Sequence, residues 1–316
     1  MPGFDLITIG RVSVDLYPEQ IGVSLADVRT FAKSLGGSAT NVAVGAARLG
    51  RRSAVITKVG DDGFGAYVRA ALASFGVDAR WVGTDPTLRT PLVFCEVHPP
   101  DHFPLLFYRQ PKAPDLNISL ADLDLDAIAD AAIFWTTGTG LSEEPSRAAT
   151  LTAMARRGRR MTVHDLDHRP ALWSAPADAR RLAQEAIARA TVVIGNLDEV
   201  EMALGTRDPP RATAELLDRG VELAVVKQGP RGVLARTARE IVEVAPLPVE
   251  VLCGLGAGDA FGGALCHGLL ARWDLARTIA FANAAGAIVA SRLACADAMP
   301  TAAEVEELLA RQVRVG

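Results

Sequence analysis

Strand-like and helix-like segments alternate along most of this 316-residue chain. Short apolar runs, such as FDLITIG at 4–10 and SAVITKVG at 53–60, have the length and composition of buried strands. They are followed by segments with apolar residues at helical spacing that stop at a glycine, such as 39–50 and 65–76. The alternation predicts an α/β fold with a mostly parallel central sheet and helices on both faces. In such a sheet, ligands bind at the carboxyl ends of the strands.

Two segments, 11–33 and 86–117, do not follow this alternation. The second contains strand-like runs at 90–98 and 103–110 joined by PPDH, which indicates a hairpin. We expect the two segments to form a small β-strand lid over the carboxyl edge of the sheet. The other residues are expected to form the α/β core that binds nucleotide and substrate: 1–10, 34–85 and 118–316.

Composition argues against several other classes of protein. With 49% hydrophobic residues the chain can bury a large core, and its net charge of −4 provides no basic surface for nucleic acid or an anionic membrane. The sequence has neither a secretion signal nor an apolar run of about 18 residues, so we expect a cytoplasmic protein without nucleic-acid or membrane partners. The cysteines lack C-x-x-C spacing and are expected to be reduced, buried thiols: Cys95, Cys253, Cys266 and Cys295.

The segment GLGAGDAFGG, residues 254–263, places one acid, Asp259, among five glycines at the start of an expected helix over about 257–272. Unpaired N–H groups at a helix N-terminus bind anions such as phosphate. A carboxylate there would repel the anion, but it suits a base that takes a proton from an incoming hydroxyl. The alternative is a glycine-rich helix start in which Asp259 is an ordinary cap.

A second glycine turn, SLGGSATN at 34–41, also leads into an expected helix. Gly36 and Gly37 permit close approach of the backbone to a ligand, and the Asn41 amide offers a donor and an acceptor, which suits a polyol. The alternative is a plain N-cap at Ser38.

Two further loops follow expected strands. Asn196 and Glu199 in NLDEVE can serve a hydrated Mg²⁺, or they can form a capping box at a helix start. Lys227 and Gly229 in KQGPRG are placed for phosphates, or they form a β-turn. The sequence contains neither a Walker A motif nor a complete G-x-G-x-x-G fingerprint.

Taken together, GGSATN early in the chain, GAGDAF late in the chain, and the N-x-x-E and K-x-G segments between them resemble the ribokinase-like (PfkB) carbohydrate kinases over nearly the whole length. The resemblance implies a ribokinase-like fold, with ATP and Mg²⁺ as cofactors. It implies that Asp259 is the catalytic base. It also implies that backbone N–H groups form an anion hole for the transferred phosphoryl group, at Gly256, Ala257 and Gly258.

The same resemblance implies roles for other residues. Glu199 would hold Mg²⁺ through water. The nucleotide and its phosphates would contact Asn196, Glu199, Lys227, Gly229, Gly232 and Asn283. The sugar hydroxyls would contact Asp15, Gly37 and Asn41.

Two arginines narrow the range of sugars that we expect as substrate. Arg109 lies in the lid segment, and Asp165 and Arg169 lie in HDLDHRPALW after a core strand. A guanidinium group holds a carboxylate in a bidentate fork, so these residues predict a sugar acid, although each arginine can instead form a surface ion pair. The sequence resembles family members that phosphorylate C6 of 5-dehydro-2-deoxy-D-gluconate in inositol catabolism. Alternatives left open are 2-dehydro-3-deoxygluconate, fructose or another neutral sugar, and a catalytically silent sugar or nucleoside sensor.

One departure from the family pattern concerns the residues before GAGD. Many relatives have Asp-Thr-Thr there, where the aspartate helps to hold a monovalent cation. This chain has Cys253, Gly254 and Leu255, which offer no anionic oxygen, so the sequence argues against K⁺ activation unless backbone carbonyls hold the ion. Lid strands of some relatives pair across a two-fold axis, which favours a homodimer through the lid.

Overall fold

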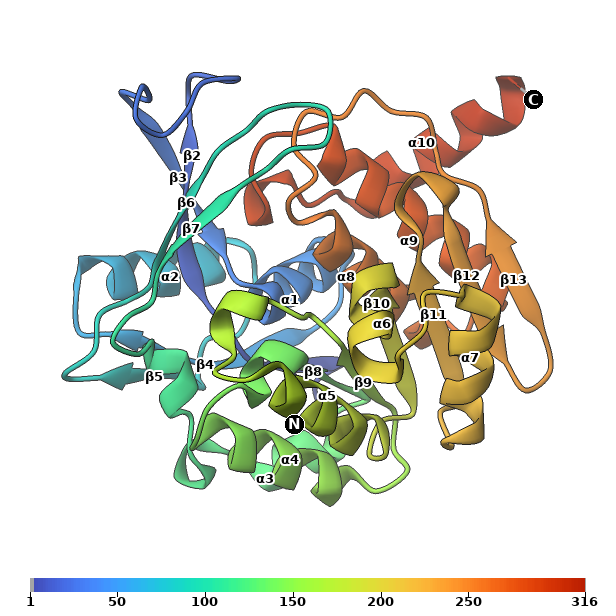
Figure 1. Cartoon of the computed structure of the whole chain (residues 1–316), viewed down its shortest axis with the longest axis horizontal. Coiled ribbons are helices and arrows are strands. Elements are labelled where there is room, and N and C mark those ends of the chain that lie inside the picture. The colour runs from blue at the N-terminus through green and yellow to red at the C-terminus, as the bar shows by residue number, and fades with distance from the viewer. Residues whose placement is uncertain (1–2, 316) are drawn as a thin grey trace.

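A nine-stranded sheet runs through the computed structural model, which describes residues 3–315 (Figure 1). The strand order is β13-β12-β11-β10-β9-β8-β1-β4-β5, and all neighbours are parallel except β11–β12 and β12–β13. This confirms the predicted mostly parallel α/β architecture. The strands are β1 (Leu6–Ile9), β4 (Ser53–Gly60), β5 (Val82–Asp85), β8 (Ile133–Thr137), β9 (Thr162–Asp165), β10 (Val192–Asn196), β11 (Leu223–Lys227), β12 (Val233–Thr237) and β13 (Ile241–Val244).

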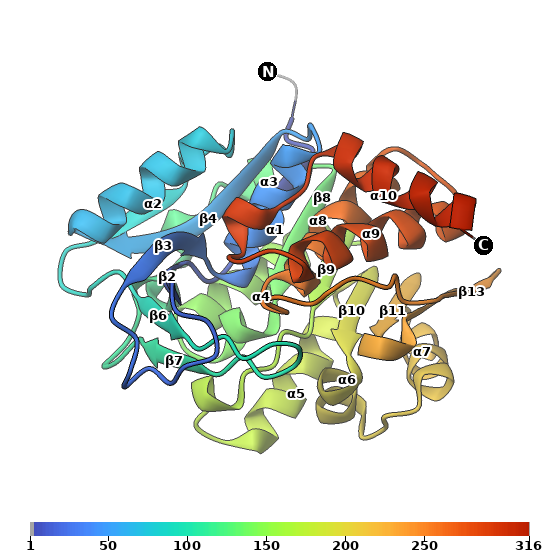
Figure 2. The ribbon, with the colours of Figure 1, turned by 90° about the horizontal axis from the view of Figure 1, so that it is seen from above.

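Successive side chains of the central strands enter two different cores, because side chains alternate across a sheet. Leu6 packs in one core and its neighbour Ile7 packs in the other. Helices therefore cover both faces (Figure 2). The first core receives α1 (Ser38–Arg48), α2 (Gly63–Ser74), α8 (Ala257–Leu270), α9 (Leu275–Ala290) and α10 (Ala302–Val315). The second core receives α3 (Leu125–Asp130), α4 (Ser146–Arg157), α5 (Pro176–Ile187), α6 (Leu197–Leu204) and α7 (Pro209–Asp218).

Helices α1 and α8 approach each other closely because glycines line their contact. A Cβ atom on Gly263 would lie 2.9 Å from the Ala46 nitrogen, and one on Gly262 would lie 2.6 Å from the Trp135 ring. Larger residues would push α8 away from α1 and from the sheet. The small residues of GLGAGDAFGG therefore also allow α8 to pack closely against α1.

A second sheet of four strands, in the order β3-β2-β6-β7, stands beside the main sheet (Figures 1 and 2). Its strands are β2 (Ser13–Pro18), β3 (Phe31–Gly36), β6 (Leu92–Cys95) and β7 (Leu105–Tyr108). The predicted lid segments, 11–33 and 86–117, contain most of this sheet. However, β3 continues to Gly36 because Ser34 pairs with Asp15 across the β2–β3 ladder. The function of this sheet as a lid remains a prediction, and we call it the lid sheet below.

The four cysteines are buried, and each is a free thiol. Among residues 3–315, no helix is both long and apolar enough to cross a membrane.

Candidate active site

The glycine-rich segment forms a tight turn at the start of α8. Gly256 has φ 81° and ψ −10°, a left-handed conformation that favours glycine. A Cβ atom at this position would lie 2.8 Å from the Cys295 sulfur. Helix α8 begins at Ala257, so the N–H groups of its first turn are the unpaired donors that can bind an anion.

Asp259 lies in this first turn and faces α1. The Asn41 Nδ2 donates a hydrogen bond to Asp259 Oδ2 at 2.8 Å, which joins the two motifs across 218 positions of sequence. Burial raises the pKa of Asp259 to about 6, although the Asn41 hydrogen bond lowers it. The Asn41 Oδ1 atom is buried and has no hydrogen-bond partner in the described part of the chain, so it can accept a bond from a ligand hydroxyl.

Two cavities meet at this turn. The smaller one, of about 70 Å³, we call the polar cleft. Side chains of the lid sheet line one side of it, including Val93, Leu105 and Phe107. Its polar lining consists of Arg11, Ser13, Asp15, Tyr17, Ser38, Asn41, Arg169 and Asp259, together with the backbone of Gly37 and Gly256.

Asp15 is held at the edge of the polar cleft by its neighbours. The Ser13 hydroxyl donates to its Oδ1 at 2.6 Å, and Gly36 leaves room for the carboxylate, since a Cβ atom on Gly36 would lie 2.1 Å from Asp15 Oδ2. Burial raises the pKa of Asp15 to about 6. Asp15, Gly37 and Asn41 all line the cleft, as expected for residues that contact sugar hydroxyls.

The larger cavity, of about 540 Å³, is mostly apolar, and we call it the apolar cavity. Such a cavity suits a flat aromatic ring with a few polar contacts. Asn283 is one of its few polar side chains and donates to the Ala245 carbonyl at 2.9 Å. Four of the predicted nucleotide residues line it: Lys227, Gly229, Gly232 and Asn283.

The start of α8 lies where the two cavities join. Gly256 lines the polar cleft, and the next residue, Ala257, lines the apolar cavity. Lys227 adds positive charge here, because a Cβ atom on Gly258 would lie 3.2 Å from its Nζ. A ligand group that passes from one cavity to the other therefore meets a helix N-terminus and a lysine, both of which favour an anion.

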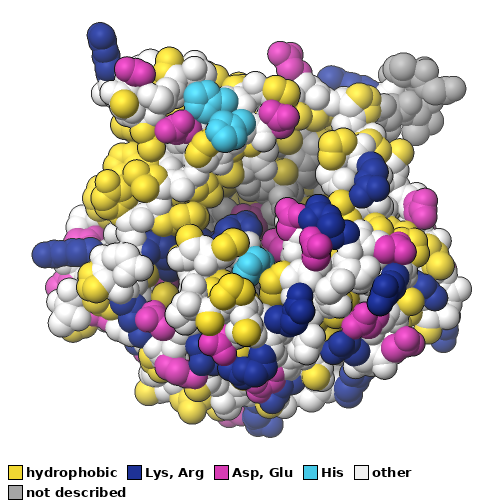
Figure 3. Space-filling view, viewed as in Figure 1, with side chains coloured by type: hydrophobic (Ala, Val, Ile, Leu, Met, Phe, Trp, Pro, Cys, Tyr) yellow, Lys and Arg dark blue, Asp and Glu magenta, His cyan; other side chains and the backbone are white. Residues whose placement is uncertain are grey.

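Seven charged residues surround this junction, and Figure 3 shows basic and acidic side chains beside a hollow in this face of the molecule. Burial raises the pKa of Asp165 to about 7, although the Lys227 charge lowers it. Burial lowers the pKa of Lys227, but Asp165 and Glu199 raise it further, so Lys227 remains charged. The seven residues are Arg11, Asp165, Asp167, Arg169, Glu199, Lys227 and Asp259.

Asn196 and Glu199 form a reciprocal capping box at the start of α6. Asn196 Oδ1 accepts from the Glu199 N–H at 2.9 Å, and Glu199 Oε2 accepts from the Asn196 N–H at 2.7 Å. The capping role is therefore present. Within residues 3–315 no three His, Cys, Asp or Glu side chains are grouped to hold a metal. One carboxylate, that of Glu199, fits an Mg²⁺ ion that keeps several water ligands and is bound mainly by phosphate groups.

Two predicted substrate contacts do not line the polar cleft. Arg109 is buried in an ion pair with Asp115, with 2.5 Å between Nη2 and Oδ1, and its Nη1 donates to the Val12 carbonyl at 3.3 Å. Asp165 is buried at the end of β9, where its Oδ1 accepts from the Asp167 N–H at 3.2 Å. Neither side chain lines the cleft and both have protein partners, so contact of Arg109 or Asp165 with the substrate stays a prediction without support from the cleft lining.

Two residues that line or support the cleft were missed. Arg11 follows β1 and lines the cleft, and Asp167 lies between Asp165 and Arg169 with a positive φ of 27°. The position of Arg11 at the carboxyl end of a parallel strand was a usable signal, because ligands bind at that edge. The role of Asp167 depends on side chains from distant segments, which the sequence does not reveal.

This arrangement, a doubly covered parallel sheet with an anion-binding turn between two cavities, is a ribokinase-like fold. The model of the pfkB family carbohydrate kinases matches residues 4–302, and the chain belongs to this family. It is 33% identical to a 5-dehydro-2-deoxygluconokinase of Geobacillus kaustophilus, over 96% of this chain and 93% of that protein. It is 36% identical to a protein of the same name from Photobacterium profundum, over 94% and 92% of the two chains.

Solved structures share the fold over nearly the full chain. A putative ribokinase II of E. coli in complex with ATP and Mg²⁺ superposes with a TM-score of 0.89 at 25% identity, covering 98% of this chain and 99% of the other. A fructokinase double mutant from Vibrio cholerae, bound to fructose, ADP and potassium ion, superposes with a TM-score of 0.86 at 26% identity, with the same coverage.

Proposed function

We propose that this protein transfers the γ-phosphoryl group of ATP to the C6 hydroxyl of 5-dehydro-2-deoxy-D-gluconate, a step of myo-inositol catabolism. The observation that carries this proposal is the position of the α8 N-terminus, with Asp259 in its first turn, at the junction of the polar cleft and the apolar cavity. A kinase needs this arrangement, because acceptor and donor must meet at a site that stabilises the charge of the transferred group.

ATP would place its adenine in the apolar cavity and its phosphates beside Lys227 and the glycine turn. The N–H groups of Gly256, Ala257 and Gly258 would stabilise the transferred phosphoryl group. Mg²⁺, when bound with the nucleotide, would neutralise phosphate charge, and Glu199 would hold it through water with Asn196 beside it. The ATP and Mg²⁺ in the E. coli structure support this assignment of the cofactors.

The sugar would lie in the polar cleft with its hydroxyls against Asp15, Gly37 and Asn41. Asp259 would accept the C6 hydroxyl proton as that oxygen attacks the γ-phosphorus, and the bond to the β–γ bridging oxygen would break to release ADP. The raised pKa of Asp259 suits this role, since a general base works best when its pKa approaches the operating pH.

The identity of the sugar is supported by two observations. Several relatives at 30–36% identity carry the name 5-dehydro-2-deoxygluconokinase. In addition, two guanidinium groups, those of Arg11 and Arg169, line the polar cleft, and a neutral sugar has no need of them.

The test is a coupled assay of ADP release with purified protein, ATP and Mg²⁺. We expect kcat/KM for 5-dehydro-2-deoxy-D-gluconate to exceed that for 2-dehydro-3-deoxygluconate and for fructose by at least ~10², a ratio typical of a site with polar contacts to a distinguishing group. Comparable turnover of fructose would contradict the sugar-acid assignment. Absence of ADP release with every sugar would favour a silent sugar or nucleoside sensor.

Three finer expectations belong to this proposal. The protein would act in the cytoplasm, and two copies would pair through their lid sheets. Activity would not depend on K⁺, because Cys253, Gly254 and Leu255 supply no anionic side chain, and burial raises the pKa of the Cys253 thiol. Assays with K⁺ replaced by tetramethylammonium would test the last point.

A further inference from the structure

One carboxylate, that of Asp167, lies between two arginines of the polar cleft. Its Oδ2 is 3.4 Å from Arg11 Nη2, and its Oδ1 is 3.2 Å from Arg169 Nη2. Arg11 follows β1 and Arg169 follows β9, so the aspartate joins segments that are more than 150 positions apart. Asp167 itself does not line the cleft, whereas both arginines do.

Hydroxyl groups from two other segments fix the same carboxylate. Ser38, at the start of α1, and Thr139 donate to Asp167 Oδ2 at 2.7 and 2.6 Å. Thr139 Oγ1 also accepts from Arg11 Nε at 2.9 Å. Asp167 is 3% exposed, so its oxygens are occupied by protein donors and are shielded from a ligand.

The backbone of Asp167 is strained at this point. Its φ of 27° is positive in a residue other than glycine, a conformation that costs ~1–3 kcal/mol and persists where the surroundings over-determine it. Burial raises the pKa of Asp167, but the Arg11 and Arg169 charges lower it further, to about 2, so the carboxylate stays ionised. The network therefore joins the two arginines to two carboxylates, because Arg169 Nη1 also lies 3.6 Å from Glu199 Oε1.

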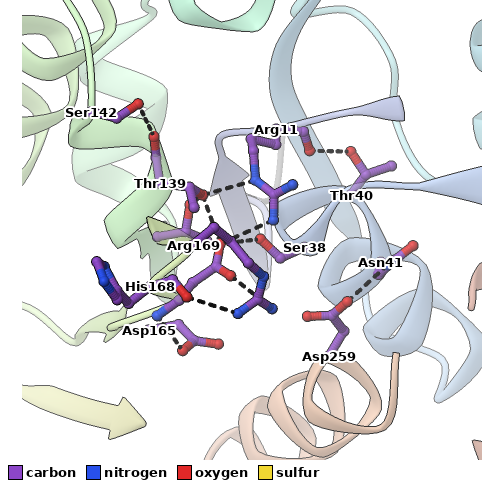
Figure 4. A network of polar contacts seen from close by, with 12 residues as sticks. Arg11, Ser38, Thr40, Asn41, Thr139, Ser142, Asp165, His168, Arg169 and Asp259 are labelled. Atoms are coloured by element: carbon purple, nitrogen blue, oxygen red, sulfur yellow. Dashed lines mark hydrogen bonds and ion pairs between the residues drawn. The ribbon is translucent and has the colours of Figure 1, made fainter. Parts of the chain in front are cut away.

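The free face of this pair is directed at the cleft. Within the described residues, Arg11 Nη1 makes no hydrogen bond. The Arg169 side chain is 40% exposed, although its Nη1 also donates to the His168 carbonyl at 3.1 Å. Figure 4 shows both guanidinium groups on the side of the network that faces the Asn41–Asp259 pair. A substrate with a hydroxyl at Asp259 would thus present its other end to the free Nη1 of Arg11 and to the exposed Arg169 side chain.

We propose that Asp167 is a positioning residue that holds Arg11 and Arg169 as a two-guanidinium clamp for the carboxylate of the sugar acid. The inference rests on the proposed function. It gives Arg11 the contact with the substrate carboxylate that the sequence predicted for Arg109. Two like charges at this spacing repel each other, and the anion between them keeps both forks in one orientation. The clamp makes the cleft selective for acids over neutral sugars of the same length.

The test compares kinetics for 5-dehydro-2-deoxy-D-gluconate, for D-fructose as the neutral sugar, and for ATP. Arg11→Met should raise KM for the acid at least ~10-fold, the loss expected for one charged hydrogen bond, with KM for ATP changed less than ~2-fold. The preference for acid over fructose should fall by the same factor, because the neutral sugar does not use the clamp. Arg292→Met, which removes a guanidinium paired with Glu304 outside the cleft, is the matched control and should change none of these values.

Asp167→Asn tests the positioning role. It should raise KM for the acid ~10-fold with little change in kcat. The double variant Arg11→Met/Asp167→Asn should lose less affinity than the two single losses combined, because Asp167 acts in part through Arg11. Arg11→Lys keeps the positive charge but lacks the guanidinium group, so KM for the acid should rise less than in Arg11→Met. This variant tests the clamp if Arg11→Met does not fold.

The outcomes separate the two proposals. A wild-type protein that does not phosphorylate the acid overturns the proposed function, and the clamp with it. A wild-type protein that does phosphorylate the acid, with an unchanged acid-to-fructose preference in Arg11→Met or Arg11→Lys, overturns the clamp alone. Additive losses in the double variant would overturn the positioning role of Asp167.

Discussion

Single carboxylates differ in their roles according to what surrounds them. Asp15 is buried and Asp259 is half-buried beside the polar cleft, and both have a pKa raised to about 6. Only Asp259 lies in the first turn of α8, next to the N–H groups that would bind the transferred phosphoryl group. The base of the proposed reaction is therefore identified by its position in the turn, since the raised pKa is common to both residues.

Replacement of Asp259 by asparagine should abolish most of the turnover. We expect Asp259→Asn to lower kcat by at least ~10², because the amide cannot take the C6 proton, while KM for ATP changes little. The folded protein should be no less stable in a thermal melt, because a neutral amide replaces a buried charge and can still accept from Asn41. Asp15→Asn serves as the comparison and should act mainly on KM for the sugar. Near-normal turnover in Asp259→Asn would contradict the assignment.

The same carboxylate predicts the pH dependence. Because the pKa of Asp259 in the folded protein is about 6, kcat/KM should fall as the pH drops below 6, where the base is protonated. Its pKa is raised above the ordinary value of 3.8, so between about pH 4 and 6 the folded protein holds a proton that the unfolded chain releases. The contribution of Asp259 to stability therefore decreases as the pH rises through this range.

Thermal melts at pH 4.5 and pH 7 test whether the contribution of Asp259 to stability decreases as the pH rises. Asp259→Asn should gain stability relative to the wild type at pH 7 and less at pH 4.5. An equal difference at both values would show that Asp259 has an ordinary pKa.

Sequence patterns identified residues that lie in glycine-rich motifs and missed residues whose role comes from distant partners. Asn41 and Asp259 were both predicted, and they meet at 2.8 Å. Arg109 was assigned to the substrate because the sequence did not show that Asp115 pairs with it. Arg11 was missed because its partners come from segments far away in the chain.

At the scale of elements, the turn before α8 shows how a short motif serves both folding and binding. The predicted helix over about 257–272 corresponds to α8, whose small residues allow close packing. The first lid segment was predicted to end at residue 33, whereas β3 continues to Gly36, because pairing with β2 extends the strand into the glycine turn. Periodicity identified the elements, whereas strand ends depended on a partner strand.

A comparison of two glycines tests the turn. Gly256 and Gly50 have nearly the same φ, 81° and 82°, but a Cβ atom at Gly50 would meet nothing within 4 Å. Gly50→Ala should lower the unfolding free energy by only ~1–2 kcal/mol, the cost of holding alanine in the left-handed conformation. Gly256→Ala should cost more, because its Cβ atom meets Cys295, and it should lower kcat by displacing the N–H groups of α8. Equal stability losses with unchanged kcat would contradict a role of this turn in the reaction.

For the molecule as a whole, one hairpin of the lid sheet reaches both cavities. Leu105 and Phe107 line the polar cleft, and Pro100 and Phe103 line the apolar cavity. Movement of this hairpin would therefore open or close both sites together, which would exclude water while donor and acceptor are bound. The hairpin needs a firm attachment to the core at its base, and the Arg109–Asp115 pair lies there.

Asp115 links the two connections between the lid sheet and the core. It pairs with Arg109, which follows β7, and its Oδ2 accepts from the Val12 N–H, which precedes β2, at 3.0 Å. Arg109 is 5% exposed and Asp115 is 1% exposed. Arg109→Met should therefore lower the unfolding free energy by ~3–5 kcal/mol, because it leaves an uncompensated buried charge, and should speed hydrogen exchange in residues 92–108.

The double variant Arg109→Met/Asp115→Asn separates an attachment from a substrate contact. The asparagine can still accept from Val12 and carries no charge, so we expect most of the lost stability to return, together with a KM for the sugar acid close to that of the wild type. If Arg109 held the substrate carboxylate, KM would stay high in the double variant even though its stability had recovered. Thermal melts and steady-state kinetics on the wild type, the single variant and the double variant therefore decide whether this arginine attaches the lid sheet or binds the substrate.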